Sequence, residues 1–233
     1  MKKASVRELA VRLALLLAGL CIAHLGVTLF LQSNLGSDPF NVLIQGLYRS
    51  LPWPNWAGMT HGRTHLTVSL LILVVLLFVD RAQVRVGTVI CMALGGPIID
   101  VYTLWLAPFL NDSLPMAARL LMLVAGCVIL AFGMTVVIRS QAGTGPNDLV
   151  AVVISEKLKR PFGIVRVIVD VCFAGVGFAL GGVLGLGTVI CAFLVGPVAQ
   201  VFLPVSGRIC DYVLRKVGLA SQERRKNEDR IGF

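Results

Sequence analysis

Charged residues are scarce in this sequence. Only 14% of the 233 residues are Asp, Glu, Lys or Arg, whereas 57% are hydrophobic and the mean hydropathy is +0.86. Soluble domains have about 25% charged and about 45–50% apolar residues. The chain therefore has too few charges to cover a soluble globule of its size, and its composition indicates helices in a lipid bilayer.

The residue patterns of common catalytic and metal sites are also missing. The chain has three histidines and six cysteines, but no C-x-x-C pair, paired-histidine motif or nucleophile elbow. An enzyme is therefore the least favoured function, and no cofactor or metal is expected. The net charge of +9 is better explained by the basic cytoplasmic side of membrane proteins than by nucleic acid, because aromatic and basic residues are not interleaved.

Long apolar runs account for the hydrophobic excess. A spanning helix needs about 20 mostly apolar residues. The first run, Val11–Leu31, exceeds the core of a cleaved signal peptide, which is about 7–15 residues, and no small-x-small site follows it. We therefore predict a retained first helix. The six predicted spans are 10–32, 65–80, 86–108, 116–138, 164–181 and 184–204.

The distribution of basic residues predicts the orientation. If the N-terminus is cytoplasmic, 18 of the 21 Lys and Arg residues fall on the cytoplasmic side of this layout. This bias predicts a multi-pass protein of the bacterial cytoplasmic (inner) membrane with both termini inside. Residues 1–205 would form a single membrane domain, and residues 206–233 a basic cytoplasmic tail.

An internal duplication is the strongest pattern in the sequence. The motif Gly-x-Thr-x4-Ser-x2-Gly-Ser/Thr-x-Pro occurs at 26–39 and again at 133–146. Gly-Thr-Val-Ile-Cys-x2-Leu-x-Gly-Pro occurs at 87–97 and at 187–197, where eight of eleven positions are identical. The offsets are 107 and 100 residues. They indicate two three-span repeats, about 10–110 and 116–204.

Three spans per repeat imply that the second repeat is inverted relative to the first. Inverted repeats are common in secondary transporters, where one pseudo-symmetric structure opens alternately to either side. They also occur in channels and in some membrane enzymes, and duplication can simply build a stable bundle. The predicted fold class is an all-α polytopic membrane bundle of two inverted three-helix repeats with short re-entrant or interfacial helices.

Each repeat contains a small polar loop after its first span. Asp38-Pro39 predicts an N-cap followed by proline in the first turn, and Gly145-Pro146 predicts the same with a weaker cap. The short helices that follow either dip into the membrane or lie at its interface. Free N–H groups there favour anions, but Asp38 and Asp148 oppose that field, so the sign of a ligand stays open. The candidate substrate-binding residues are Ser33, Gly36, Ser37, Asp38 and Asn41, and Ser140, Gly143, Thr144, Asn147 and Asp148.

Polar residues inside the spans form a second candidate group. Charges within a membrane usually face the bundle interior and are functional candidates by default. The members are His24, Asp100, Arg166, Asp170 and Gln200, the last being the repeat mate of Asp100. Arg166 and Asp170 are four residues apart and meet on one helix face. The pair could be purely structural, and His24 could be a packing residue.

Glycine motifs predict close packing. Gly177-x3-Gly181-x3-Gly185 is typical of a small-residue helix ridge and offers a face for a homodimer. The Gly-Pro pairs at 96–97 and 196–197 should kink the third and sixth spans, either as hinges or as static bends.

The chain resembles the YczE branch of the YczE/YyaS/YitT membrane proteins over about residues 10–205. The resemblance is carried by Gly36–Asn41, Gly143–Asp148, Val165-Arg166-x3-Asp170, Gly181–Thr188 and Gly196-Pro197-x2-Gln200. The family usually has Ser-Pro-Trp-Asp in the first loop, Gly-Pro-Arg-Asp in the second, and often Glu at position 170. This chain has Asp-Pro-Phe-Asn, Gly-Pro-Asn-Asp and Asp there. The resemblance implies a bacterial multi-pass membrane protein and supplies no substrate.

Two functions are consistent with these patterns. The first is a secondary transporter or permease for a small polar metabolite, with the two loops as binding site and His24, Asp100 or Asp170 as proton-coupling groups. The second is a membrane-embedded accessory or regulatory protein that acts through a protein partner, with the basic tail as part of its surface. The lipid bilayer is the expected environment in both cases.

Overall fold

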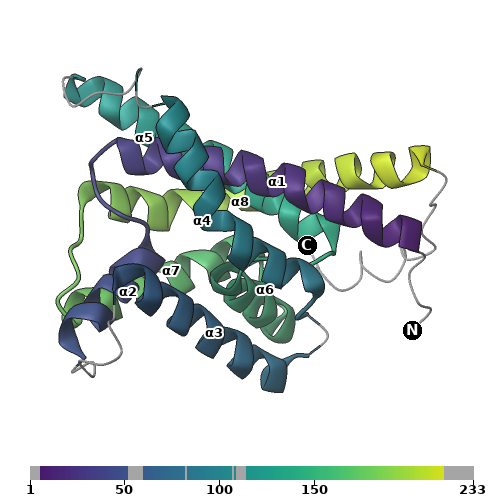
Figure 1. Ribbon diagram of the computed structural model, residues 1–233, viewed down its shortest axis with the longest axis horizontal. Helices are drawn as coiled ribbons and strands as arrows, with labels where there is room; N and C mark the ends of the chain where they lie inside the picture. Colours follow the sequence, from purple (N-terminus) through teal and green to yellow (C-terminus); the bar gives the residue numbers. More distant parts are fainter. Residues whose placement is uncertain (1–5, 52–59, 82, 107, 109–113, 218–233) are drawn as a thin grey trace.

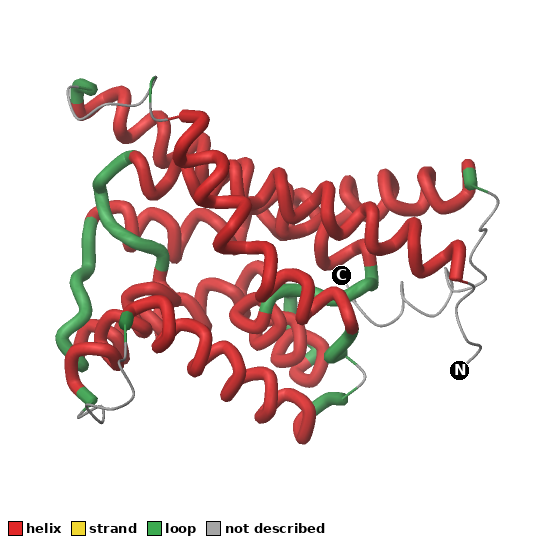
Figure 2. Tube along the Cα trace, viewed as in Figure 1, coloured by secondary structure: helices red, strands yellow, loops and turns green. Residues whose placement is uncertain are grey.

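The computed structural model describes residues 6–51, 60–81, 83–106, 108 and 114–217. Within these residues the protein consists of helices and connecting loops, without strands (Figure 2). Six helices are long and apolar enough to cross a membrane. They are α1 (Val6–Gln32), α3 (His61–Val79), α4 (Val86–Leu106), α5 (Met116–Ser140), α7 (Phe162–Ala179) and α8 (Leu186–Lys216). The prediction of an all-helical chain with six spans is confirmed.

Two short helices follow the polar loops, as the sequence predicted. They are α2 (Pro39–Ser50) and α6 (Pro146–Leu158). The Asp38 side chain caps α2 by accepting a hydrogen bond from the Asn41 backbone, and proline occupies the first turn. Helix α6 also has proline in its first turn, but no side chain caps its N-terminus. The weaker cap predicted at Gly145 is confirmed.

Close backbone contact between α1 and α5 forms the centre of the bundle. A Cβ atom at Gly133 would lie 2.7 Å from the Gly19 carbonyl oxygen, and one at Gly126 would lie 2.8 Å from the Gly26 oxygen. Only glycine permits this separation, because such distances are shorter than any ordinary carbon–oxygen contact. In Figure 1, α1, α5 and α8 run along the upper half, α2, α3, α6 and α7 lie below, and α4 crosses between the groups.

Helix α8 is longer than the sixth predicted span. It continues beyond residue 204 to Lys216, because Ser206, Cys210 and Leu214 recur at a spacing of four residues and are buried. The predicted start of the tail at 206 therefore falls inside α8, and most of that tail, from 218 onward, lies outside the described residues. The start of α1 and the end of α8 lie at the same end of the molecule (Figure 1).

The predicted glycine ridge at 177–185 is wrong as a helix face. Helix α7 ends at Ala179 and α8 begins at Leu186, so Gly181 and Gly185 lie in the connection. Gly177 instead packs against the backbone of α2 at Val42 and Leu43. The motif therefore supplies no dimer face, and a homodimer stays a prediction.

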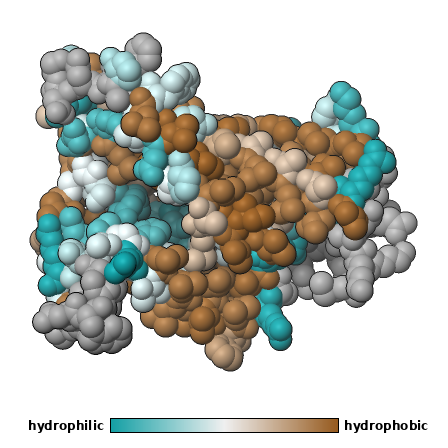
Figure 3. Space-filling view, viewed as in Figure 1, coloured by the Kyte–Doolittle hydropathy of each residue, from teal (hydrophilic) through white to brown (hydrophobic). Residues whose placement is uncertain are grey.

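The exterior is strongly apolar. Phe78 is 88% exposed, Leu104 77% and Leu121 71%, and brown apolar surface covers much of the face in Figure 3. Such continuous apolar exposure marks a surface that another apolar medium covers. On six apolar helices, that medium is the lipid bilayer.

Candidate functional site

The two polar loops have the same backbone conformation. Asn34 and Gln141 both adopt left-handed backbone, with φ of 53° and 57°. Gly36 and Gly143 have φ of 144° and 138°, values that side-chain-bearing residues rarely adopt. Each pair is separated by the repeat offset of 107 residues. The sequence duplication therefore extends to the backbone geometry of the loops.

Each loop docks onto the start of a helix from the other repeat. The Gly187 N–H of α8 donates to the Leu35 carbonyl at 2.8 Å, and the Gly87 N–H of α4 donates to the Ala142 carbonyl at 2.9 Å. Gly36 and Gly143 lie against these helix starts, so a Cβ at either would collide with them. These two candidate ligand positions therefore act in packing.

The first loop is organised around Asp38. Its carboxylate accepts from the Asn41 backbone N–H at 3.1 Å and from the Asn41 side chain at 2.5 Å. Asp38 is also within electrostatic range of His65 on α3, whose ring meets Phe40 edge-on. The Ser37 carbonyl accepts a hydrogen bond from Thr188 at 2.5 Å. The carboxylate of Asp38 thus caps a helix and also faces α3.

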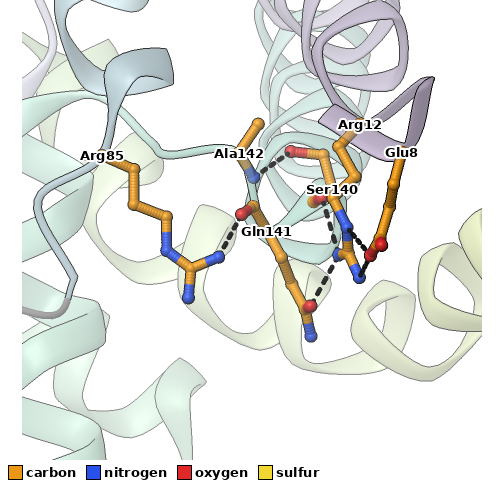
Figure 4. Close-up of polar contacts among 6 residues, drawn as sticks. All are labelled: Glu8, Arg12, Arg85, Ser140, Gln141 and Ala142. Carbon is orange, nitrogen blue, oxygen red and sulfur yellow. Dashed lines mark hydrogen bonds and ion pairs between the residues drawn. The ribbon is translucent and has the colours of Figure 1, made fainter. Parts of the chain in front are cut away.

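The second loop is held by two arginines that the sequence patterns did not connect with it (Figure 4). Arg12 of α1 donates to the Ser140 carbonyl at 3.3 Å and to the Gln141 side chain at 2.6 Å, and it pairs with Glu8 at 2.9 Å. Arg85 donates to the Gln141 carbonyl. Because Arg12 lies in the first turns of α1 and the first loop follows the end of α1, the two loops occupy opposite ends of that helix.

Two of the three candidate serines, Ser33 and Ser140, donate to carbonyls of the helices that end beside them. Ser33 donates to the Phe30 carbonyl at 2.6 Å, and Ser140 donates to the Val137 carbonyl at 2.7 Å. Ser140 also accepts from the Ala142 N–H at 3.2 Å. Their hydroxyl groups close the helix ends, and this arrangement favours a structural role.

The central feature of the site is a buried network of Asp148, Arg166 and Asp170, called the Arg166 network below. Arg166 donates from Nε to Asp170 at 2.9 Å, which confirms the predicted i, i+4 pair. It also donates from Nη1 to Asp148 at 2.6 Å. Arg166 is 7% exposed and Asp170 only 1%. One guanidinium on α7 therefore ties the first turn of α6 to its own helix.

Three buried oxygens in the described part of the chain have no hydrogen-bond partner. They are Oδ1 of Asp170 and the hydroxyl oxygens of Thr88 and Thr144. Thr144 lies in the second loop, four residues before Asp148, and Thr88 is beside Gly143 of the same loop. Unpartnered buried polar atoms are uncommon because their desolvation is costly. Their gathering at one loop and the Arg166 network marks this region as the best candidate site.

The other predicted residues have different surroundings. His24 is half-buried, donates from Nδ1 to the Leu20 carbonyl at 2.8 Å and lies within electrostatic range of Asp148. Asn147 is half-buried beside Gly145. Gln200 accepts from the Gly163 N–H at 2.8 Å but is exposed, contrary to the expectation that it faces the interior. Asp100 is exposed, contrary to the expectation that it faces the interior, because α4 turns its Cys91 and Gly95 face toward the bundle.

Two of these contacts had signals in the sequence that did not lead to a site assignment. Thr88 and Thr188 are equivalent members of the repeated Gly-Thr motif, but neither was among the candidate site residues. Arg12 has Arg119 as its mate at the offset of 107 residues, ahead of the repeated block that begins at 26. The Asp148–Arg166 pair had no such signal, because the two residues lie on different helices that only the tertiary fold brings together.

Comparisons with known proteins agree with this description. The chain is 26% identical over 211 residues to the uncharacterized membrane protein YczE of Bacillus subtilis (strain 168), covering 90% of this chain and 94% of the relative. It is 29% identical over 199 residues to an uncharacterized protein of Haemophilus influenzae (84% and 85% covered) and 27% identical over 195 residues to YyaS of Bacillus subtilis (82% and 91% covered).

No solved structure matches the chain. The model of DUF6198, described as a family of unknown function, matches residues 10–204. This match reaches from α1 into α8 and ends at residue 204, before the end of α8 at Lys216, and the relatives YczE and YyaS agree with the resemblance noted in the sequence. The chain is thus a helical membrane protein that belongs to the DUF6198 family.

Proposed function

We propose that this protein is a secondary transporter for a small polar metabolite, built from two inverted repeats in the bacterial cytoplasmic membrane with both termini inside. One observation carries the proposal: equivalent helix pairs in the two repeats are packed differently. In repeat two, α7 packs along α8, whereas in repeat one α3 and α4 barely touch among the described residues. Two arrangements of one repeated unit are what alternating access requires.

The closed pair is held by two glycines and a glutamine. A Cβ atom at Gly196 of α8 would lie 2.5 Å from the Gly163 carbonyl oxygen of α7. Gln200, one turn further along α8, accepts from the Gly163 N–H at 2.8 Å. This N–H is among the first-turn donors of α7, which have no partner within their own helix. The side chain thus caps α7 and fixes it to α8.

The equivalent positions in repeat one are open. Gly62, like Gly163, is the second residue of its helix, and Gly96 is the mate of Gly196 at the offset of 100 residues. Among the residues that the structure describes, none from another helix lies within 4 Å of a Cβ atom placed at either glycine. Asp100 and its mate Gln200 are both exposed, so the difference between the repeats lies in the glycine contacts. The two glycines of the closed contact therefore have counterparts in repeat one that lie apart from other helices in the described part of the chain.

The open side leads toward a polar surface. Figure 3 shows a hydrophilic hollow between the end of α4 above and α2 and α3 below. Closing α3 onto α4 would cover this hollow, and opening α7 from α8 would uncover the opposite side. We call the α3–α4 pair and the α7–α8 pair the two gates. The candidate site lies between them, since its residues come from the second loop, α6 and α7. Loose packing between α3 and α4 together with close packing between α7 and α8 supports a carrier more than a static pore.

The proposal can be tested without a known substrate. We would introduce Asp100→Cys or Val167→Cys after replacing the six native cysteines, and label each variant with a membrane-impermeant maleimide from either side. Val167 of α7 is half-buried and lies against Gly196 of α8. Adding Gly196→Ala should push α7 from α8. Alternating access predicts that labelling at 167 then rises while labelling at 100 falls, because opening of α7–α8 is coupled to closing of α3–α4. Gly175→Ala, on an exposed face of α7, is the matched control.

The alternative functions predict other outcomes. If the protein acts through a partner, or if its two repeats do not move relative to each other, labelling at 100 should not respond to Gly196→Ala. That result would overturn the proposal. If labelling responds as the proposal predicts, uptake of labelled amines, amino acids and organic acids into proteoliposomes would identify the substrate.

A further inference from the structure

We infer that the Arg166 network is a binding site for a small monovalent cation, either an alkali-metal ion or the protonated amine of an organic substrate. The inference deepens the proposed function, on which it rests only for the step from binding to transport. It assigns a positive charge to the ligand, whereas the loop sequences leave the charge of the ligand open.

The first support is the charge balance of the network. One guanidinium, Arg166, faces two carboxylates, Asp148 at 2.6 Å and Asp170 at 2.9 Å. A third carboxylate, Asp38 of the first loop, is within electrostatic range of Asp170. A buried negative charge in excess of its partner is costly, because the low-dielectric interior does not replace its hydration. A bound cation would balance the network.

The neighbouring titratable groups do not supply a second fixed positive charge. Cys91 is within range of Asp148, and Cys191 is within range of Arg166 and Asp170, but a thiol carries no positive charge. His24 is within range of Asp148. Its Nδ1 must carry a proton, because it faces the Leu20 carbonyl at 2.8 Å and a carbonyl can only accept. The neutral ring satisfies this contact, so His24 need not be charged.

The second support is an unused ligand atom. Oδ2 of Asp170 bonds Arg166, whereas Oδ1 has no hydrogen-bond partner although the residue is 99% buried. A carboxylate oxygen is an acceptor and cannot be satisfied by another acceptor. A cation or an ammonium N–H is the chemistry that this atom lacks. Asp148, whose side chain is 20% exposed, provides a route of approach from outside the network.

The donor atoms also restrict the class of cation. The ligand atoms at the network are the carboxylate oxygens of Asp148 and Asp170, which suit hard cations and ammonium groups. Among the described residues no three His, Cys, Asp or Glu side chains gather closely enough to hold a metal ion. The excess of one carboxylate over the guanidinium of Arg166 matches the charge of a monovalent ion or a primary amine rather than that of a multivalent metal.

Thermal unfolding of the purified full-length protein in detergent would test the site. NaCl, KCl, methylammonium chloride and N-methylglucamine chloride would be titrated at fixed pH and ionic strength, with N-methylglucamine phosphate and N-methylglucamine acetate as anion probes. We expect a saturable rise in the unfolding midpoint, about 5–11 °C at 100 times Kd, with Na⁺, K⁺ or methylammonium but not with bulky N-methylglucamine. The responding probe separates an inorganic ion from an amine.

Three variants make the result specific. Asp170→Asn keeps the shape of the side chain and removes the excess charge, so it should abolish the cation-dependent rise. Asp148→Asn provides a second test if the first variant does not fold. Asp211→Asn, an exposed position near the end of α8, is the matched control and should respond like the wild type. Absence of a cation shift in the wild type, an equal shift in Asp170→Asn, or a shift with anions alone would overturn the inference. Cation binding without coupled gating would overturn transport only.

Discussion

The contact between Gly163 and Gly196 allows a quantitative comparison of the two repeats. Gly196→Ala would place a methyl group 2.5 Å from the Gly163 carbonyl oxygen and 2.8 Å from a Val167 methyl group. Normal van der Waals separation is about 3.5 Å, so α7 and α8 must move apart by about 1 Å. Gly96→Ala, at the equivalent position of α4, meets no described residue of another helix within 4 Å.

A comparison of Gly196→Ala with Gly96→Ala isolates the free-energy cost of overpacking between α7 and α8. Both substitutions gain the same helix propensity, about 1 kcal/mol in favour of alanine, so it cancels in the comparison. Overpacking costs about 1–3 kcal/mol, and about 1 kcal/mol corresponds to about 2–4 °C in a protein of this size. The Gly196→Ala midpoint should therefore lie about 2–12 °C below that of Gly96→Ala. Thermal unfolding in the same detergent measures the difference, and equal midpoints would refute the asymmetry between the repeats.

Three further predictions concern the bundle and the site. Gly133→Ala should lower the unfolding midpoint by several degrees relative to Gly175→Ala, because only the first position abuts another backbone. Arg166→Met should cost about 3–5 kcal/mol, since it leaves two carboxylates without their cation; a denaturant titration that detects no loss would contradict the network. Arg12→Gln should raise amide hydrogen exchange at residues 141–145 by weakening hydrogen bonds to the second loop, whereas exposed Arg7→Gln should not.

Local sequence rules predicted the local structure well. Asp38-Pro39 gave the cap of α2, and the spacing of Arg166 and Asp170 gave their ion pair, because both depend on neighbours within one turn. Hydropathy also predicted the six spans, because the thickness of the bilayer sets the length of a spanning helix.

Tertiary contacts were harder to predict from the sequence. Asp100 was expected inside the bundle, but which face of α4 turns inward depends on Gly95 and Cys91 packing toward α1. The link from Asp148 to Arg166 depends on how α6 lies against α7. The end of α8 was missed because the polar residues after 204 lowered the hydropathy, although every fourth residue is still buried.

The matching loops also strengthen the repeat hypothesis in a way hydropathy alone could not. Positive φ values recur at Asn34 and Gln141, and the same backbone hydrogen bond joins each loop to a Gly-Thr helix start. The inverted orientation of the two repeats in the membrane stays a prediction. It requires the first and second loops to face opposite sides, which accessibility of single cysteines in intact cells would establish.

Disulfide cross-linking of α3 to α4 is the most direct test of alternating access. A Gly62→Cys/Gly96→Cys protein without its native cysteines would be oxidised in membranes and analysed by gel mobility. In the described part of the structure a Cβ atom at either position has no neighbour within 4 Å, and a disulfide requires Cα atoms about 4.4–6.8 Å apart. If repeat one can close as repeat two does, an intramolecular disulfide forms. If no cross-link forms, or only dimers appear as in mixed single variants, α3 and α4 do not close and the carrier mechanism is wrong.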